Sequence, residues 1–106
     1  MCLKPLLIFF MRESDFQRNL VRKIKNTFKG SLVFKGPSNQ YQGIPDLIIL
    51  YKNKWAALEC KQTLKSKKQN NQPYYVKLMN EMSFARVIAP ENEKEVMDDL
   101  QRAFET

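Results

Sequence analysis

The chain has 106 residues, which fits one small domain with a modest core and little room for a buried nucleotide cofactor. It contains no histidine and only two cysteines, which excludes a Cys/His zinc site and a Ser-His or Cys-His nucleophile. Its net charge of +7 favours an anionic partner, and its side chains leave carboxylates, lysines and hard cations as the available chemistry. We therefore expect residues 1–106 to form a single domain.

Positive charge is concentrated in the first three quarters of the chain. Residues 1–80 hold 15 Lys and Arg against four acids, a net of +11, whereas residues 81–106 have a net charge of −4. A basic surface of this kind is typical of proteins that bind nucleic acid, although it can also serve only solubility. The four acids that the basic part retains are therefore candidates for a chemical role: Glu13, Asp15, Asp46 and Glu59.

The N-terminal residues 1–11 include an apolar run at 6–11, which is far too short to span a bilayer. No small-residue cleavage site follows it, so a signal peptide is not indicated. We expect this segment to be a strand or a lead-in packed on the domain. A reducing, cytoplasmic location without membrane contact follows from this reading and from the low cysteine content.

An amphipathic helix is predicted from about residue 14, where Ser14 and Gln17 match a capping box, to Gly30, which should end it. Apolar residues recur every four positions and form one stripe: Phe16, Leu20, Ile24 and Phe28. Basic residues follow the opposite face: Arg18, Arg22, Lys25 and Lys29. If the first turn includes Glu13, this acid extends the apolar stripe. It would then either meet a cation or act only as a first-turn acid that favours the helix dipole.

The remaining chain predicts three strands, a helix, a strand and a helix, so the full order is αβββαβα. The predicted ranges are 31–35, 44–51, 55–61, 73–82, 84–89 and 90–104, with a hairpin turn at 52–54. The second strand is apolar on both faces, as a central strand would be. Buried positions are expected on the last two helices: Tyr75, Val76, Met79, Met82, Val96, Leu100 and Phe104.

Two acids and a lysine are predicted to meet at one end of this hairpin. Asp46 begins the second strand, and Glu59 and Lys61 share one face of the third because alternate side chains of a strand point the same way. Cys60 should point to the opposite face. Paired carboxylates repel each other, and Mg²⁺ or Mn²⁺ with oxygen ligands would remove that cost. The alternative is an ordinary hairpin with a Glu–Lys pair on its surface.

The arrangement resembles the PD-(D/E)xK nuclease superfamily, in particular its VRR-NUC branch and the phage and archaeal Holliday-junction resolvases. The residues that carry this resemblance are Gly43-Ile44-Pro45-Asp46-Leu47, Leu58-Glu59-Cys60-Lys61, Gln72 with Tyr75 and Met79, Arg86-Val87-Ile88-Ala89, and Glu13 with Phe16-Gln17. It covers about residues 12 to 100. It implies an α/β (α+β) fold in which helices flank a central mixed sheet, with a restriction-endonuclease-like core.

The resemblance also implies the site chemistry. Asp46, Glu59 and the backbone carbonyl of Cys60 would bind Mg²⁺, with Mn²⁺ as a substitute. Glu13 would complete the acidic cluster directly or through water, and Lys61 would orient or activate the attacking water. Gln72 would support the site from the second helix, as a further catalytic residue: the catalytic set is Glu13, Asp46, Glu59, Lys61 and Gln72.

Several polar and basic residues could bind the DNA backbone around this site: Arg18, Arg22, Asn39, Gln40, Tyr41, Lys65, Lys67 and Lys68. No base-reading module is evident, so the sequence predicts an endonuclease selective for branched or Holliday-junction DNA, of a phage or mobile-element type. A chain with one active site must pair to cut two strands, so a homodimer is expected. The alternatives are a non-catalytic nucleic-acid-binding module on the same fold and a sequence-specific, restriction-type nuclease.

Overall fold

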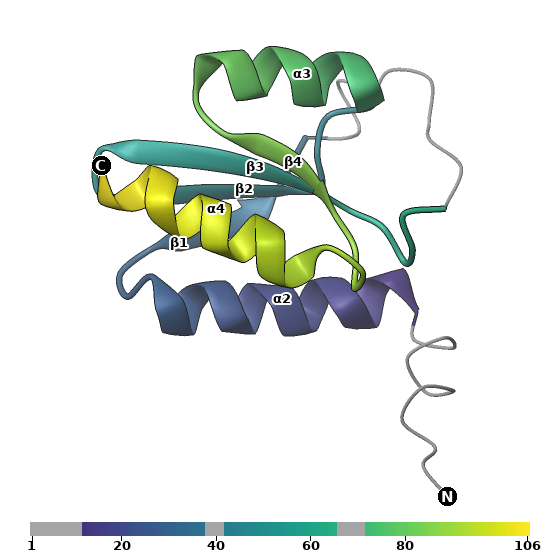
Figure 1. Cartoon of the computed structure of the whole chain (residues 1–106), viewed down its shortest axis with the longest axis horizontal. Coiled ribbons are helices and arrows are strands. Elements are labelled where there is room, and N and C mark those ends of the chain that lie inside the picture. The colour runs from purple at the N-terminus through teal and green to yellow at the C-terminus, as the bar shows by residue number, and fades with distance from the viewer. Residues whose placement is uncertain (1–11, 38–41, 66–71) are drawn as a thin grey trace, which may run out of the picture.

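The structure is a computed structural model that describes residues 12–37, 42–65 and 72–106, so the predicted lead-in at 1–11 lies outside it (Figure 1). Within this part the chain forms three helices and four strands. In chain order they are α2 (Glu13–Thr27), β1 (Leu32–Lys35), β2 (Leu47–Tyr51), β3 (Lys54–Cys60), α3 (Gln72–Met82), β4 (Ala85–Ile88) and α4 (Glu93–Glu105). None of the helices in the described ranges is long and apolar enough to cross a membrane.

The four strands form one mixed sheet in the order β1-β2-β3-β4. Strands β1, β2 and β3 are antiparallel neighbours, and Lys52 adopts a φ of 57° in the two-residue turn between Tyr51 and Lys54. Strand β4 pairs with β3 in parallel, which requires a crossover, and α3 provides it. The expected α+β class with a mixed sheet flanked by helices is therefore confirmed.

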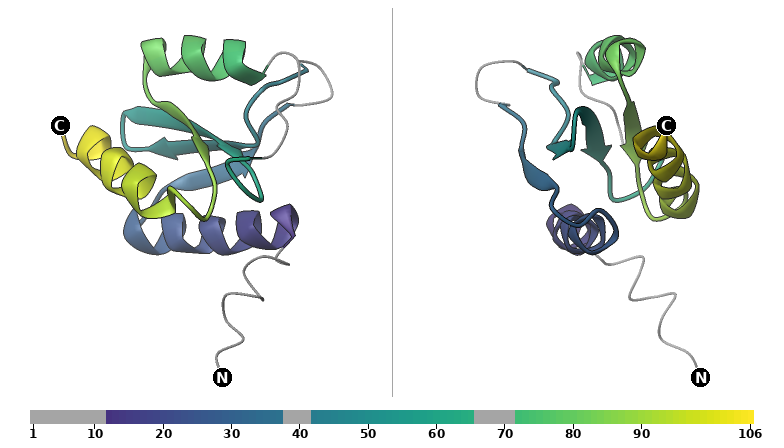
Figure 2. Two further views of the ribbon diagram at one scale, coloured as in Figure 1. Left: turned by 45° about the vertical axis from the view of Figure 1, so that its right-hand side comes forward. Right: turned by 90° about the vertical axis from the view of Figure 1, so that its left-hand side faces the viewer.

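Helices cover the two faces of the sheet unequally (Figure 2). Helices α2 and α4 pack on one face, where they bury the core with alternate residues of β2 and β3. Helix α3 lies on the other face, against β3 and β4. The part of this second face formed by β1 and β2 is covered by none of these three helices. Leu50 of the central strand β2 is consequently 39% exposed, so the expectation that β2 is buried on both faces is wrong.

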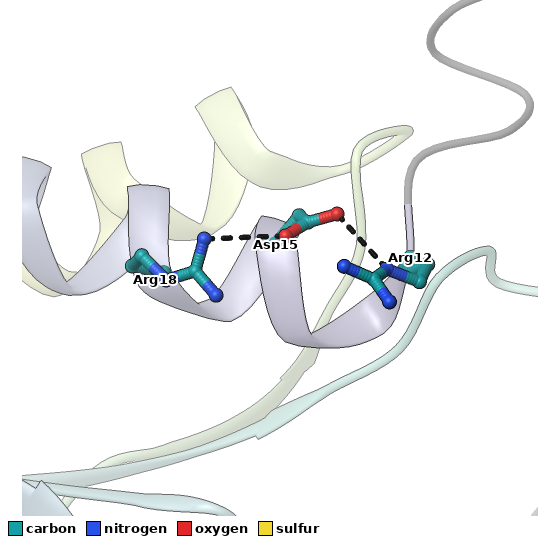
Figure 3. A network of polar contacts seen from close by, with 3 residues as sticks. All are labelled: Arg12, Asp15 and Arg18. Carbon is teal, nitrogen blue, oxygen red and sulfur yellow. Dashed lines mark hydrogen bonds and ion pairs between the residues drawn. The ribbon is translucent and has the colours of Figure 1, made fainter.

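The apolar stripe of α2 is buried as predicted, but the predicted capping box is wrong. The helix begins one residue earlier than Ser14, with Arg12 as its N-cap and no side-chain cap. Instead, Asp15 lies in the first turn, where a negative charge stabilises the helix dipole, and pairs with Arg12 and Arg18 (Figure 3). The helix ends at Thr27, and Gly30 follows with a φ of 88°, a conformation that favours glycine.

Burial on the last two helices follows the predicted stripes except at one residue. Val96, Leu100 and Phe104 of α4 are buried in the core, and Tyr75 of α3 is half-buried. Met82, however, is 66% exposed, which contradicts its expected burial. Met82 is the last residue of α3, and at this end the helix no longer packs on the sheet.

Gly36 brings the end of β1 against the start of β2. Its N–H donates a hydrogen bond to the carbonyl of Asp46 at 2.8 Å. A Cβ at this position would lie 2.1 Å from the carbonyl oxygen of Pro45 and 2.8 Å from Cγ2 of Ile44. No side chain fits at such distances, so the close approach that fixes Pro45 and Asp46 depends on this glycine.

Replacing Gly36 by alanine should therefore destabilise the protein by about 3 kcal/mol, because the clash involves backbone that cannot move aside cheaply. Urea denaturation measures this loss. Gly30→Ala is the matched control, because the space around Gly30 is open and only its backbone conformation resists, at about 1 kcal/mol. A Gly36→Ala protein as stable as wild type would contradict the packing described here.

Candidate active site at the end of the β2–β3 hairpin

The hairpin register places the predicted acids opposite each other. Leu47 pairs with Leu58 in the antiparallel ladder. One step further along the same register, Asp46 stands opposite Glu59, and directly opposite residues share a face of the sheet. The N-terminal end of α2, which begins at Glu13, lies at this same end of the sheet (Figure 1).

The side chain of Asp46 is tied to the end of β3. Its Oδ2 accepts a hydrogen bond from the backbone N–H of Cys60 at 2.9 Å. The neighbouring N–H of Lys61 points the other way, toward β4, where it donates to Ile88 at 2.9 Å. The N–H and C=O of one strand residue point to the same side of the strand. The carbonyl of Cys60 therefore points to the side on which Asp46 lies.

Glu59 and Lys61 are the buried charged side chains of the described ranges, with 1% and 7% of their surfaces exposed. Lys61 Nζ lies 3.5 Å from Glu59 Oε2, so the two form an ion pair. Removing two charges from water costs several kcal/mol per ion, and the pair attraction repays this only in part. Such a pair in a small core is therefore costly for folding, and such groups are typical of functional sites.

Electrostatic coupling joins the acids of this region. Burial, and then the charge of Asp46, raise the pKa of Glu59 to about 7, although Lys61 opposes the shift. Burial also raises the pKa of Asp46, against the hydrogen bond from Cys60 and the charges of Lys61 and Lys35. The pKa of Glu13 is raised by desolvation and by Asp46. The three carboxyls thus resist being ionised together.

Cys60 points into the opposite face, as its position between Glu59 and Lys61 predicts. Its side chain is fully buried in the core formed with α2 and α4. Burial is the largest cause of its raised pKa, followed by the charges of Asp46 and Glu59. A thiol held in its protonated form is a poor nucleophile, so Cys60 contributes through its backbone and its packing.

Glu13 does not close a three-acid metal cluster. Its side chain is exposed at the start of α2 instead of extending the buried stripe. In the described ranges, no group of three or more Asp, Glu, His or Cys side chains is arranged to hold a metal ion. The donor set that remains is two acids, Asp46 and Glu59, with the Cys60 carbonyl on the side of Asp46. It is rich in oxygen and suits a hard cation that keeps several waters.

The segment that follows Lys61 is held by Glu91, a residue that the sequence reading did not single out. The Glu91 carboxylate accepts a hydrogen bond from the hydroxyl of Thr63 and another from the N–H of Leu64 at 3.1 Å. The bond from Thr63 is the largest cause of the lowered pKa of Glu91. These contacts anchor the stretch that carries the exposed Lys65, whose charge also lowers the pKa of Glu91.

The structure describes only some of the other predicted site residues. Arg18 and Arg22 are exposed on α2, and Arg18 is partly neutralised by Asp15 at 3.2 Å (Figure 3). Gln72 is the first residue of α3, and its side chain is not among those that the structure describes. The remaining predicted DNA contacts also lie outside the described residues: Asn39, Gln40, Tyr41, Lys67 and Lys68.

Lys35 is a second residue that the sequence reading missed. It ends β1 opposite Leu47, next to Asp46, and its charge lowers the pKa of that acid. Together with Arg18 it lines a groove of about 360 Å³ between α2 and β1. Aligning the strand 31–35 against the second strand would have placed Lys35 here, whereas no local signal marks Glu91.

Comparison of the chain with family models, with curated proteins and with solved structures found no match. The resemblance to the PD-(D/E)xK nucleases therefore stays an expectation from the residues of this chain.

Glu59 should make the protein less stable as pH rises through neutrality. Its pKa is about 7 in the folded chain against an ordinary value of 4.5, so between these values the native state holds more protons than the unfolded state. The free energy of unfolding should then fall as pH rises from about 4.5 to above 7, by up to about 3 kcal/mol.

Urea denaturation in EDTA across this pH range measures the effect. Glu59→Gln is the comparison protein, because the amide keeps the shape and cannot titrate. As pH rises, the free energy of unfolding of wild type should fall relative to that of Glu59→Gln. Parallel pH profiles would show that Glu59 titrates normally.

Proposed function

We propose that this protein is a metal-dependent nuclease that hydrolyses DNA phosphodiester bonds at the end of the β2–β3 hairpin. The observation that carries the proposal is the buried Glu59–Lys61 pair opposite Asp46, two acids and an amine held together at a cost to stability. The order of these residues along the chain, and their place at the start of β2 and the end of β3, support the PD-(D/E)xK assignment. We extend the proposal to a restriction-endonuclease-like core of the VRR-NUC and Holliday-junction-resolvase type.

Asp46, Glu59 and the carbonyl of Cys60 are the proposed ligands of Mg²⁺, or of Mn²⁺ in its place. Burial raises the pKa values of both Asp46 and Glu59, and the charge of Asp46 adds to the shift of Glu59, so ionising the two acids has a cost that a cation would relieve. When bound, such an ion lowers the pKa of a coordinated water and stabilises charge on a phosphate. Glu13 is close enough to act on both acids electrostatically and serves this cation through water.

Lys61 has the proposed role of placing a positive charge where negative charge develops on the phosphate. Its Nζ is buried beside Glu59, in surroundings that screen a charge much less than water does. Its backbone N–H is bonded to β4, so the residue is fixed at the base of its side chain. Gln72 has the proposed role of supporting this group from the start of α3.

The proposed DNA surface combines the basic side of α2 with the segments that border the site. Arg18, Arg22, Lys35 and Lys65 supply exposed positive charge, and Arg18 and Lys35 line the groove between α2 and β1. Phosphate contacts of this kind give affinity without sequence preference, which favours selectivity for branched or junction DNA over a fixed sequence. Cutting two strands with one site per chain requires two copies, so the proposed enzyme is a homodimer.

Asp46→Ala should abolish cleavage of a four-way DNA junction and of plasmid DNA, with a rate loss of at least about 100-fold, while binding is retained. The loss follows from removing a metal ligand without removing the basic surface. The assay compares wild type and variant with Mg²⁺, Mn²⁺ or EDTA, and a gel-shift measurement in EDTA follows binding. Asp98→Ala is the matched control, because Asp98 pairs with Lys94 on the outer side of α4.

Unchanged cutting by Asp46→Ala would show that the assigned site is wrong. A wild-type protein that binds but cuts no DNA with either ion would favour the non-catalytic binding module. Fragments with one constant end sequence would favour a restriction-type enzyme.

Mg²⁺ or Mn²⁺ should raise the melting temperature of the wild-type protein at pH 8, which is above the pKa of about 7 of Glu59. A ligand at 100 times its Kd stabilises the native state by about 2.7 kcal/mol. Differential scanning fluorimetry measures the shift, which Glu59→Gln and Asp46→Asn should lose and Asp98→Asn should keep. Equal shifts in all four proteins would place the ion elsewhere.

A further inference from the structure

An apolar stripe lies exposed on the face of the sheet opposite α2 and α4. Leu32, Phe34 and Leu50 are 62%, 49% and 39% exposed. The β1–β2 register pairs Leu32 with Leu50 and Phe34 with Ile48, so these four side chains share one face. Helix α3 packs against β3 and β4 on this face, and none of the described helices lies over β1 and β2 there (Figure 2). A contiguous group of exposed apolar side chains is typical of an interaction surface.

The stripe reaches the outer edge of the sheet that the described residues form. Strand β1 is the edge strand, and its sequence Leu-Val-Phe-Lys carries a single charge, at its last residue. Edge strands of monomeric proteins are usually blunted by inward-pointing charges, prolines or bulges, because their unpaired backbone groups can bind another strand. The first three residues of β1 have none of these features, and no strand of the described residues pairs with the outer edge of β1, so this edge and the exposed face beside it can bind an apolar strand.

We propose that β1 is the interface with a second copy of this chain, paired with β1 of that copy in an antiparallel manner about a two-fold axis. The two sheets then continue into one, and their α3-bearing faces stay on the same side. This inference rests on the exposed strand and not on the proposed nuclease activity.

The sequence of β1 is complementary to itself in one register. With Val33 on the axis, opposite the partner subunit's Val33, Leu32 stands opposite the partner subunit's Phe34. Leu32 of each copy therefore packs against the aromatic ring of the other copy. Cross-strand pairs of an aliphatic and an aromatic side chain stabilise a sheet. Lys35 stands opposite the partner subunit's Ser31, so the two lysines do not face each other. Isologous pairing of this kind closes a dimer and leaves no further edge of the same type.

Light scattering after size-exclusion chromatography tests the interface. Wild type should have twice the mass of one chain at micromolar concentration, and Leu32→Glu/Phe34→Glu should have the mass of one chain. Met82→Glu is the matched control, because Met82 is 66% exposed but lies at the end of α3, and it should remain dimeric. Circular dichroism verifies that each variant is folded, as expected for exposed positions. A monomeric wild type, or a dimer that survives both glutamates, would overturn the proposal.

The register is tested by cross-linking in a Cys2→Ser background, where the remaining Cys60 is buried. Directly opposite residues of antiparallel strands have Cα atoms about 4.5 to 5.5 Å apart, which suits a disulfide. Val33→Cys should therefore form a covalent dimer on mild oxidation, whereas Asn53→Cys in the distant, exposed hairpin turn should not. Equal cross-linking of both variants, or none for Val33→Cys, would overturn the proposed register.

Discussion

The hydrogen bond from the Cys60 N–H to the Asp46 carboxylate fixes the geometry on which the candidate site depends. It extends the β2–β3 pairing one step beyond the ladder, at the point where β2 has not yet begun. The acid of one strand is thereby held against the strand that carries Glu59 and Lys61. Gly36 reinforces this arrangement from β1, because its lack of a side chain allows the backbone at Pro45 to approach.

The buried Glu59–Lys61 pair explains why this site costs stability. A purely structural pair at these buried positions would be replaced by apolar residues at little cost, or even with a gain. Keeping the charges is reasonable if they act on a ligand, since a low-dielectric site strengthens their effect on an incoming phosphate. The raised pKa of Glu59 has the same origin, because burial makes the ionised carboxylate less favourable than the neutral acid.

Local sequence patterns predicted correctly which face of a helix is buried. They failed where the exact start of a helix, or the packing of a neighbouring element, determines the outcome. The spacing of Phe16, Leu20 and Ile24 identified the buried stripe of α2, because helical periodicity depends only on the chain itself. The capping box at Ser14 was wrong because the helix starts at Glu13, and its N-cap, Arg12, pairs with the first-turn acid Asp15 instead. The burial of Met82 was wrong because periodicity does not tell where α3 leaves the sheet.

The sequence alone determined which residues can meet at the candidate site: strand alternation places Glu59 and Lys61 together, and a short hairpin turn places Asp46 near them. Only the tertiary structure decided how buried these charges are, that Glu13 stays exposed, and that Lys35 and Glu91 border the site from other elements. It also decided that α3 leaves one face of β1 and β2 uncovered. The physical reason is that alternation and turn length are local properties of the backbone. Burial and charge coupling depend instead on segments distant in sequence, whose packing no local pattern encodes.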